Sequence, residues 1–280
     1  MTDTSSNNAA IHPRNIRMVI EYDGTNYVGW QFQINGVSVQ ETLETALATA
    51  LGHSVRVLAA GRTDAGVHAK GQVVNFFTNS HLPTRAILVQ TLRRLPEDIA
   101  IVSVDDVPFD FNARCNATLR WYKFFLLNRS IRPTAGRQYL THVYGKLDFD
   151  AMEQVCDLLA GVHDFRAFRS INCQAVRTLL TMRRPRIQRF PDGLITVDYM
   201  ARSFLQNMVR IMTGCLVSVG RGRMAPAEVA LMMEDYHRPV EAVTLPPQGL
   251  FLYHVYYGDE PPEGTYPDDS GHPLFPLAQS

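Results

Sequence analysis

The sequence has no long hydrophobic run and no signal-peptide core. Its 280 residues are 46% apolar, but every apolar stretch is far shorter than the roughly 20 residues that a membrane-spanning helix needs. Residues 1–13 are polar and lack the apolar segment of a secretory signal. These absences predict a soluble protein that does not enter a membrane.

Signatures of disulfide, metal and nucleotide sites are missing as well. The four cysteines, at positions 115, 156, 173 and 215, form no CxxC pair, so neither a disulfide framework nor a zinc site is expected. The nine histidines form no HExxH motif, and no glycine-rich phosphate loop is present. The pattern favours a protein of the reducing cytoplasm.

Charge is balanced in total but uneven along the chain. Lys plus Arg and Asp plus Glu number 27 each, which argues against a uniformly basic nucleic-acid-binding protein. Residues 112–147, however, contain seven basic residues and no acid, residues 166–223 contain eleven arginines against two aspartates, and residues 258–280 contain five acids and no Lys or Arg. Charge runs are commonly solvated faces. The arginine guanidinium also binds phosphate through two hydrogen bonds and stacks on bases, so RNA binding remains an alternative interpretation.

Hydrophobic periodicity predicts alternating strands and helices. Strands are predicted at 16–22, 55–59, 72–77, 99–104, 119–127, 178–188, 194–201 and 250–257. Helices are predicted at 38–51, 84–95, 148–159, 203–219 and 226–233. Ser38 and Glu41, three residues apart, have the spacing of a capping box at the start of the first helix.

These elements fall into two α+β halves, 14–112 and 113–257, separated by a break near residues 109–113. We expect the halves to build a mostly antiparallel sheet. Residues 1–13 are polar, and residues 258–280 are rich in Pro, Gly and acid, so both are predicted to be disordered tails.

The most informative stretch is the nonapeptide GRTDAGVHA, residues 61–69, which joins two predicted strands. It places Asp64 two residues after Arg62, among glycines that allow close approach of a backbone. By residue type alone, Asp64 also fits an ordinary turn residue and Arg62 a surface charge. The nonapeptide nevertheless resembles the catalytic loop of the TruA family of tRNA pseudouridine synthases, in which its Asp is the nucleophile.

Other segments resemble the same family in the same order. They are YDGT at 22–25, GWQ at 29–31, VQE to Leu at 39–47, AGVHDF at 160–165, SFLQNMVR at 203–210 and PQGLFL at 247–252. The resemblance covers residues 17–257. It implies the pseudouridine synthase fold, in which two ferredoxin-like halves form one continuous sheet. It also implies a homodimeric isomerase that modifies uridines at positions 38, 39 and 40 in the anticodon stem-loop of tRNA.

The implied reaction exchanges a C–N glycosidic bond for a C–C bond within one nucleotide. Nothing is oxidised or added, so no metal and no small-molecule cofactor is expected. An ionised carboxylate must assist departure of uracil, either by covalent attack or by stabilising positive charge on the sugar. Asp64 is the expected carboxylate. A closed pocket would raise its pKa unless a cation lies nearby, and the resemblance implies that this cation is Arg210.

The remaining site residues follow from the same resemblance. Arg62 is expected to occupy the gap left in the RNA stem when the uridine flips out. Tyr122 matches the family's active-site tyrosine, which stacks on uracil and is a candidate base for the proton at C5. Its neighbours Arg120 and Lys123 are expected to bind the substrate.

The strand that carries Tyr122 departs from the commoner family pattern at two positions. Trp121 stands where a basic residue is frequent, and Phe124 stands where a second tyrosine is frequent. The RNA contacts near Trp121 are therefore expected to differ from those of the family.

Two other functions fit parts of the pattern. A non-catalytic tRNA-binding or RNA-folding protein would use the same basic surface, but the presence of all the expected catalytic residues argues for an enzyme. A glycoside hydrolase would need a second carboxylate paired with Asp64. Asp23, Glu41 and Asp164 are not obviously placed for that role.

Overall fold

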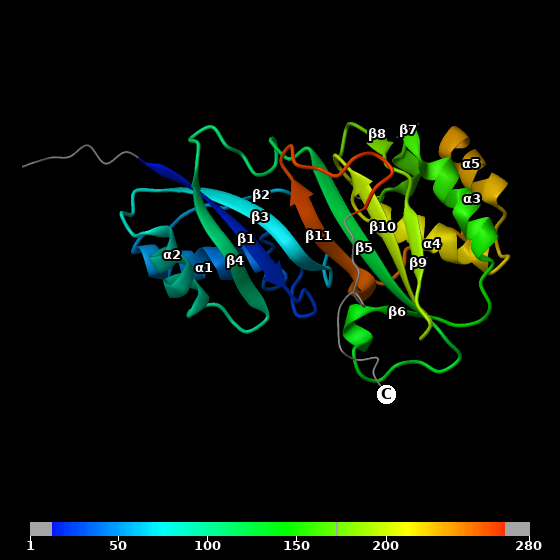
Figure 1. The fold of residues 1–280 in the computed structure, drawn as a ribbon, viewed down its shortest axis with the longest axis horizontal. Helices are drawn as coiled ribbons and strands as arrows, with labels where there is room; N and C mark the ends of the chain where they lie inside the picture. The colour runs from blue at the N-terminus through cyan, green and yellow to red at the C-terminus, as the bar shows by residue number, and fades with distance from the viewer. Residues whose placement is uncertain (1–12, 172, 267–280) are drawn as a thin grey trace, which may run out of the picture.

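The computed structural model describes residues 13–171 and 173–266, and Figure 1 shows their arrangement. The helices are α1 (Val39–Leu51), α2 (Thr84–Leu92), α3 (Phe149–Leu159), α4 (Met208–Gly220) and α5 (Pro226–Asp235), with 3-10 turns η1 (Arg137–Tyr139), η2 (Arg166–Phe168) and η3 (Pro247–Gly249). The strands are β1 (Arg14–Tyr22), β2 (Leu58–Ala59), β3 (His68–Thr78), β4 (Ile99–Val107), β5 (Leu119–Asn128), β6 (Thr141–Val143), β7 (Gly161–Asp164), β8 (Leu179–Met182), β9 (Arg186–Arg189), β10 (Leu194–Ala201) and β11 (Leu250–Tyr256).

Within the described residues, the eleven strands form one sheet. Its main path is β4-β1-β3-β11-β5-β10-β8-β7, while β2 pairs with β3, β6 with β5 and β9 with β10. In the part of the chain that the structure describes, β11 with β3 and β5 with β6 are the parallel pairs, and the others are antiparallel. The predicted α+β class with a mostly antiparallel sheet is confirmed.

Strand β11 joins the two halves of the chain (Figure 1). On one side Phe251 and Leu252 pair in parallel with His68 and Ala69 at the start of β3. On the other side Leu252 is the antiparallel partner of Tyr122 in β5. The last strand therefore brings the end of the GRTDAGVHA loop beside the strand that carries Tyr122.

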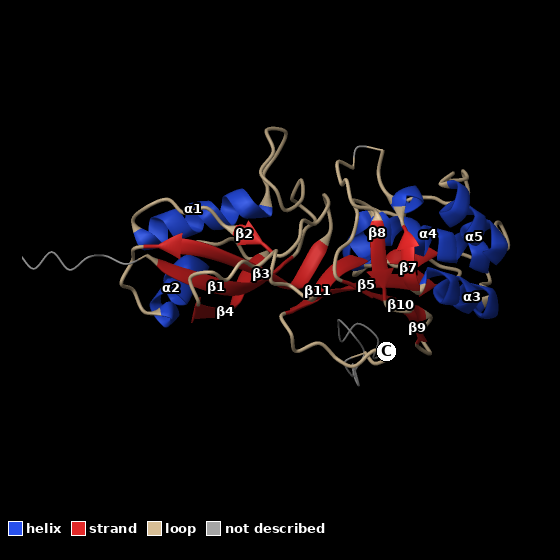
Figure 2. Cartoon of the chain, turned by 90° about the horizontal axis from the view of Figure 1, so that it is seen from above, coloured by secondary structure: helices blue, strands red, loops and turns tan. Residues whose placement is uncertain are grey.

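The helices form two groups at opposite ends of the molecule. Figure 2 shows α1 and α2 beside the N-terminal strands, and α3, α4 and α5 beside the C-terminal strands. Apolar side chains from both groups belong to one buried cluster, which includes Leu43 of α1, Ile20 of β1 and Met212 of α4, each fully buried. This continuous core fixes the two halves against each other, because burying apolar side chains is the main stabilising contribution in folding.

Two elements have boundaries that differ from the predicted ones, and individual residues explain both differences. The strand predicted at 178–188 is divided into β8 and β9, because Pro185 between them has no N–H to donate to a neighbouring strand. The helix predicted from Ser203 begins only at Met208, because Asn207 adopts φ 62° and ψ 1°, outside the right-handed helical region.

Smaller boundary shifts occur in the N-terminal half. The strand predicted at 55–59 is reduced to β2, β3 begins at His68 rather than Gln72, and α2 ends at Leu92 rather than Leu95. The predicted cap of α1 is confirmed, since the Ser38 side chain accepts a hydrogen bond from the backbone N–H of Glu41 at 3.2 Å.

Most of the two predicted tails, residues 1–12 and 267–280, lies outside the described residues. Residues 258–266 are described and pack against the sheet, because their backbone and side chains find partners there. Arg183 donates to the Pro261 carbonyl at 2.7 Å, and the Arg186 guanidinium lies 4.4 Å from the centre of the Tyr266 ring. No helix within the described residues is long and apolar enough to cross a membrane.

Candidate active site

The loop between β2 and β3 is held in place by neighbouring elements of the N-terminal half. Trp30 donates its backbone N–H to the Thr63 carbonyl at 3.0 Å, and the hydroxyls of Tyr22 and Thr63 are 2.8 Å apart in a buried contact. Gln72 of β3 donates its side-chain amide to the Gly61 carbonyl at 2.8 Å. The loop that carries Asp64 is therefore preorganised by hydrogen bonds on both of its sides.

Close packing behind this loop requires a glycine at position 29. Gly29 has φ +110°, a conformation that side-chain-bearing residues rarely adopt. A Cβ at this position would lie 2.8 Å from the Thr63 carbonyl oxygen, which real Cβ atoms essentially never do. The glycine of the GWQ segment thus allows the neighbouring chain to approach the loop.

Asp64 and Arg210 come together from opposite halves of the chain. Nη1 of Arg210 lies 3.5 Å from Oδ2 of Asp64, and the two side chains are 16% and 24% exposed. Two further contacts hold the guanidinium: Nε donates to the Leu245 carbonyl at 2.8 Å, and Nη1 donates to Oδ1 of Asn207 at 2.8 Å. The structure therefore places the predicted carboxylate beside the predicted cation.

The environment of Asp64 acts on its pKa in two directions. Burial raises the pKa above its ordinary value, because it disfavours the charged form. The charge of Arg210 and the hydrogen bonds from Arg210 and from the backbone N–H of Asn207 lower it and oppose this effect. The net direction is upward, so the guanidinium limits the rise and favours the ionised carboxylate that nucleophilic attack requires.

Tyr122 lies beside this pair on β5 and is buried, with 7% of its surface exposed. Its ring meets Phe204 edge to face, with 4.9 Å between the ring centres. Burial raises its pKa well above the usual tyrosine range, and Tyr22 and Asp64 add to this effect. The hydroxyl is therefore neutral, which suits a stacking partner for uracil better than a proton-abstracting phenolate.

The other expected substrate-binding residues occupy different environments. Arg62 is exposed, two residues before Asp64. Arg120 is 7% exposed, and its guanidinium donates to the backbone carbonyls of Ala60, Arg114 and Arg202. Arg120 thus ties the start of the Asp64 loop to the chain that leads into α4, and its guanidinium is occupied by these carbonyls instead of facing an RNA surface.

Lys123 lies on the opposite face of the sheet from Tyr122, because successive residues of a strand point to opposite faces. It is fully buried, with Nζ 3.6 Å from Oδ1 of the equally buried Asp198. The indole N–H of Trp121 donates to the same oxygen at 2.8 Å. The expectation that Lys123 binds substrate is therefore corrected: Lys123, Asp198 and Trp121 form an internal polar cluster.

Several residues that complete the site were not identified from the sequence. Asn207, Leu245 and Tyr22 contact Arg210 or the Asp64 loop through polar atoms. Asn207 lies inside the SFLQNMVR segment, within the helix predicted at 203–219. The available signal was its residue type, since Asn adopts the left-handed conformation more readily than most residues.

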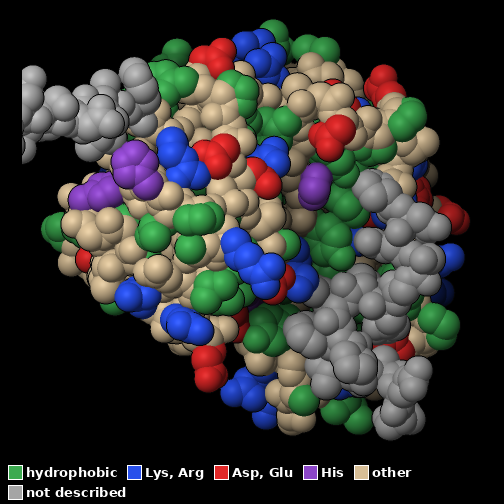
Figure 3. Space-filling model, turned by 60° about the vertical axis from the view of Figure 1, so that its left-hand side comes forward, with side chains coloured by type: hydrophobic (Ala, Val, Ile, Leu, Met, Phe, Trp, Pro, Cys, Tyr) green, Lys and Arg blue, Asp and Glu red, His purple; other side chains and the backbone are tan. Residues whose placement is uncertain are grey.

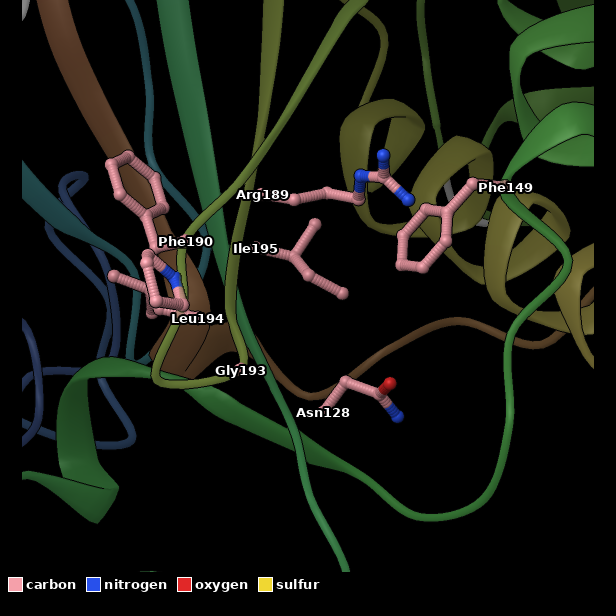
Figure 4. A pocket seen from close by; sticks show the side chains of 8 residues that line it. Asn128, Phe149, Arg189, Phe190, Gly193, Leu194 and Ile195 are labelled. Carbon is pink, nitrogen blue, oxygen red and sulfur yellow. The ribbon is translucent and has the colours of Figure 1, made fainter.

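No group of three or more His, Cys, Asp or Glu side chains that could hold a metal ion occurs among the described residues. A hollow of about 450 Å³ lies at the β9–β10 hairpin, lined by Asn128, Phe149, Arg189, Phe190, Pro191, Gly193, Leu194 and Ile195. Figure 4 shows Arg189 extended toward Phe149, and their contact measures 4.5 Å from the guanidinium to the ring centre. None of these residues belongs to the Asp64 site, so the hollow is a separate feature of the surface.

Charged side chains of both signs are mixed on the face that Figure 3 turns forward. The arginine-rich stretches nevertheless contribute exposed side chains. Exposed members include Arg129, Arg132, Arg137, Arg177 and Arg202. The basic charge found in the sequence is therefore partly available to bind phosphate.

Comparison with known proteins agrees with this geometry. The sequence model of a family described as tRNA pseudouridine synthase matches residues 18–116 and 155–258, which is more than half of the chain. A protein of Pelobacter propionicus named tRNA pseudouridine synthase A is 44% identical over 244 residues, which are 87% of this chain and 100% of that protein.

Proteins with the same name in other bacteria are similarly close. The protein of Geobacter sp. is 43% identical over 248 residues, covering 87% of this chain and 99% of that protein. The protein of Pseudoalteromonas atlantica is 41% identical over 242 residues, covering 86% and 92%. The resemblance based on the motifs is confirmed, and the chain belongs to the tRNA pseudouridine synthase family.

Proposed function

We propose that this protein converts uridine to pseudouridine in the anticodon stem-loop of tRNA, at positions 38, 39 and 40, with Asp64 as the nucleophile. The observation that carries the proposal is the position of Asp64, on a hydrogen-bonded loop with Nη1 of Arg210 at 3.5 Å. Membership of the tRNA pseudouridine synthase family supports the reaction and removes the glycoside hydrolase alternative.

The steps follow from the site. Asp64 assists cleavage of the C–N bond between uracil and ribose, uracil turns, and its C5 forms the new bond to C1′. The proton displaced from C5 leaves to water, and N1, which has lost its bond to C1′, takes up a proton from water, so atoms and charge balance without an external reagent. Arg210 keeps the carboxylate ionised by its charge.

Tyr122 and Arg62 act on the flipped nucleotide and on the RNA around it. The neutral, buried ring of Tyr122 stacks on uracil, and Tyr122→Phe tests whether the hydroxyl contributes to loss of the C5 proton. Arg62, which is exposed, fills the gap in the RNA stem with its planar guanidinium. The exposed arginines of both basic stretches bind phosphate, and we infer a cytoplasmic homodimer from the family resemblance.

The reaction is tested with unmodified tRNA that carries tritium at uracil C5. The wild-type protein is expected to release tritium to water without added cofactor or metal. Asp64→Ala is expected to abolish release, and Asp110→Asn, at an exposed aspartate in the connection between β4 and β5, should retain it. Release by Asp64→Ala at the wild-type rate would disprove the assignment of the nucleophile.

Measurements of tRNA affinity distinguish the enzyme from a non-catalytic tRNA-binding protein. Asp64→Asn removes the charge of the carboxylate and leaves the phosphate-binding arginines intact, so tRNA affinity should remain while turnover is lost. Equal loss of affinity and turnover would contradict this division of roles. Mapping of pseudouridine in the product, against tRNAs in which the uridines at 38, 39 and 40 are replaced, tests the proposed positions.

A further inference from the structure

Asn207 is in contact with both members of the pair formed by Asp64 and Arg210. Its Oδ1 accepts a hydrogen bond from Nη1 of Arg210 at 2.8 Å, and its backbone N–H lowers the pKa of the Asp64 carboxyl. The same residue therefore binds the cation through its side chain and favours the ionised form of Asp64 through its main chain.

The backbone of Asn207 is unusual for its position. It precedes α4 as the N-cap residue, yet it has φ 62° and ψ 1° instead of the extended conformation of an ordinary N-cap, and its side chain makes no capping hydrogen bond. Among the described residues other than glycine, Asn207 and Tyr236 have positive φ. Left-handed backbone at a functional site is commonly maintained because the site needs it. Here the Asn207 side chain makes no capping hydrogen bond and instead accepts from Arg210.

The distances indicate how the pair is organised. Nη1 of Arg210 is 2.8 Å from Asn207 and 3.5 Å from Asp64, while Nε is 2.8 Å from the Leu245 carbonyl. Two neutral acceptors thus hold the guanidinium more closely than the carboxylate does. The cation stays fixed when Asp64 bonds to the nucleotide, which is the preorganisation that electrostatic catalysis requires.

We propose that Asn207 is a positioning residue for the isomerisation: its side chain fixes the Arg210 guanidinium beside Asp64. The inference rests on the proposed function, because it assumes Asp64 as nucleophile. It acts through Asp64 and Arg210 and requires no contact of Asn207 with RNA.

Two substitutions separate the contributions of the side chain and of charge. Asn207→Gly retains the left-handed backbone and its N–H but deletes the acceptor for Arg210. Asn207→Asp is nearly isosteric, yet its charge competes with Asp64 for Arg210. Tyr236→Gly is the matched control, because it removes the side chain of the other left-handed residue, at the C-terminal end of α5.

The measurements are the single-turnover rate at saturating tRNA across pH, tRNA affinity and thermal unfolding. Asn207→Gly is expected to lower the rate roughly 10- to 100-fold, as for loss of a hydrogen bond to a charged group, with tRNA affinity unchanged. In both Asn207 variants the acidic limb of the pH profile should move to higher pH. The titratable and charged groups that face Asp64 are Arg210 and Tyr122. Asn207→Gly weakens the pairing of Asp64 with Arg210, and Asn207→Asp adds a second carboxylate nearby. Both changes raise the pKa of Asp64, so the reactive anion is lost at higher pH. Tyr236→Gly should match the wild type.

The role of Asn207 is overturned if both variants keep the wild-type rate and pH profile. Asn207→Gly could unfold at a lower temperature than the wild type. In that case the rate and pH profile of Asn207→Asp decide whether Asn207 has a positioning role, since Asp preserves the size and backbone preference of Asn. The assignment of Asp64 as the nucleophile is checked separately with Asp64→Ala. Turnover by Asp64→Ala would overturn the proposed function, whereas an inactive Asp64→Ala beside unaffected Asn207 variants would overturn the positioning role alone.

Discussion

Asp64 and Arg210 meet where the N-terminal and C-terminal halves join, with Oδ2 and Nη1 3.5 Å apart. Neither side chain is fully exposed, so their interaction is only partly screened by solvent. The charge state of Asp64 therefore depends on a residue that is 146 positions away in the chain.

Arg210→Ala is predicted to lower the single-turnover rate by roughly 100-fold or more, as for removal of a catalytic electrostatic contact. Burial already raises the pKa of Asp64, and removal of the guanidinium raises it further. The rate should therefore fall from the acidic side at a higher pH than in the wild type. Arg85→Ala, at an exposed arginine of α2 outside both basic stretches, is the control. An unchanged pH profile in Arg210→Ala would show that the pair does not set the ionisation of Asp64.

Arg120 is predicted to act on stability and loop position. Arg120→Ala leaves the carbonyls of Ala60, Arg114 and Arg202 without their shared donor, which should lower the free energy of unfolding by about 3 kcal/mol. Denaturant titration measures this loss. Arg114→Ala removes an exposed side chain and should change stability by less than about 0.5 kcal/mol. If Arg120→Ala weakened tRNA binding without loss of stability, the original expectation of a substrate contact would be correct.

Lys123→Met tests the corrected role of Lys123. Removal of its charge leaves Asp198 with fewer partners in a buried site, so the free energy of unfolding should fall by roughly 1–3 kcal/mol. Affinity for tRNA, measured by filter binding, should not change. Lys70→Met, which breaks an exposed ion pair with Glu21, should cost less than about 1 kcal/mol. A selective loss of tRNA affinity in Lys123→Met would contradict the structure.

Gly29→Ala is predicted to displace the Asp64 loop. The added Cβ would lie 2.8 Å from the Thr63 carbonyl oxygen, and a displacement of about 1 Å at a catalytic group can reduce a rate by about 100-fold. Gly52→Ala is a matched control, since Gly52 also has positive φ but has open space around it. Both variants should lose about 1 kcal/mol of stability from the backbone conformation. Equal activity in the two would show that the close contact at Gly29 does not position the loop.

The sequence predicted the elements whose signals are local. Apolar patterns located β1, α1, β5, α3 and β10 within about two residues, because β1, α1 and α3 bury one face and β5 and β10 are buried along almost their whole length. The GRTDAGVHA stretch identified the loop of Asp64 and, through family resemblance, its partner Arg210. Motif recognition carried this step, since residue types alone left Asp64 open as an ordinary turn residue.

The sequence did not reveal features that depend on distant contacts. Alternation along β5 separates Tyr122 from Lys123 but does not say which face holds the site, and the structure buries Lys123 on the face away from Tyr122. The charge of Arg120 suggested RNA, whereas its three carbonyl acceptors come from separate parts of the chain. Asn207 has a left-handed backbone at φ 62°, which helical periodicity could not predict.

The place of β11 in the sheet also has a consequence for synthesis on the ribosome. β3 and β5 are both adjacent to β11 and not to each other, so the two half-sheets are bridged by the strand that is translated last. A nascent chain carries Asp64 early but has no complete reaction centre until residue 256 has left the exit tunnel. Polypeptides that end before β11 are therefore expected to lack activity even when they contain Asp64, Tyr122 and Arg210.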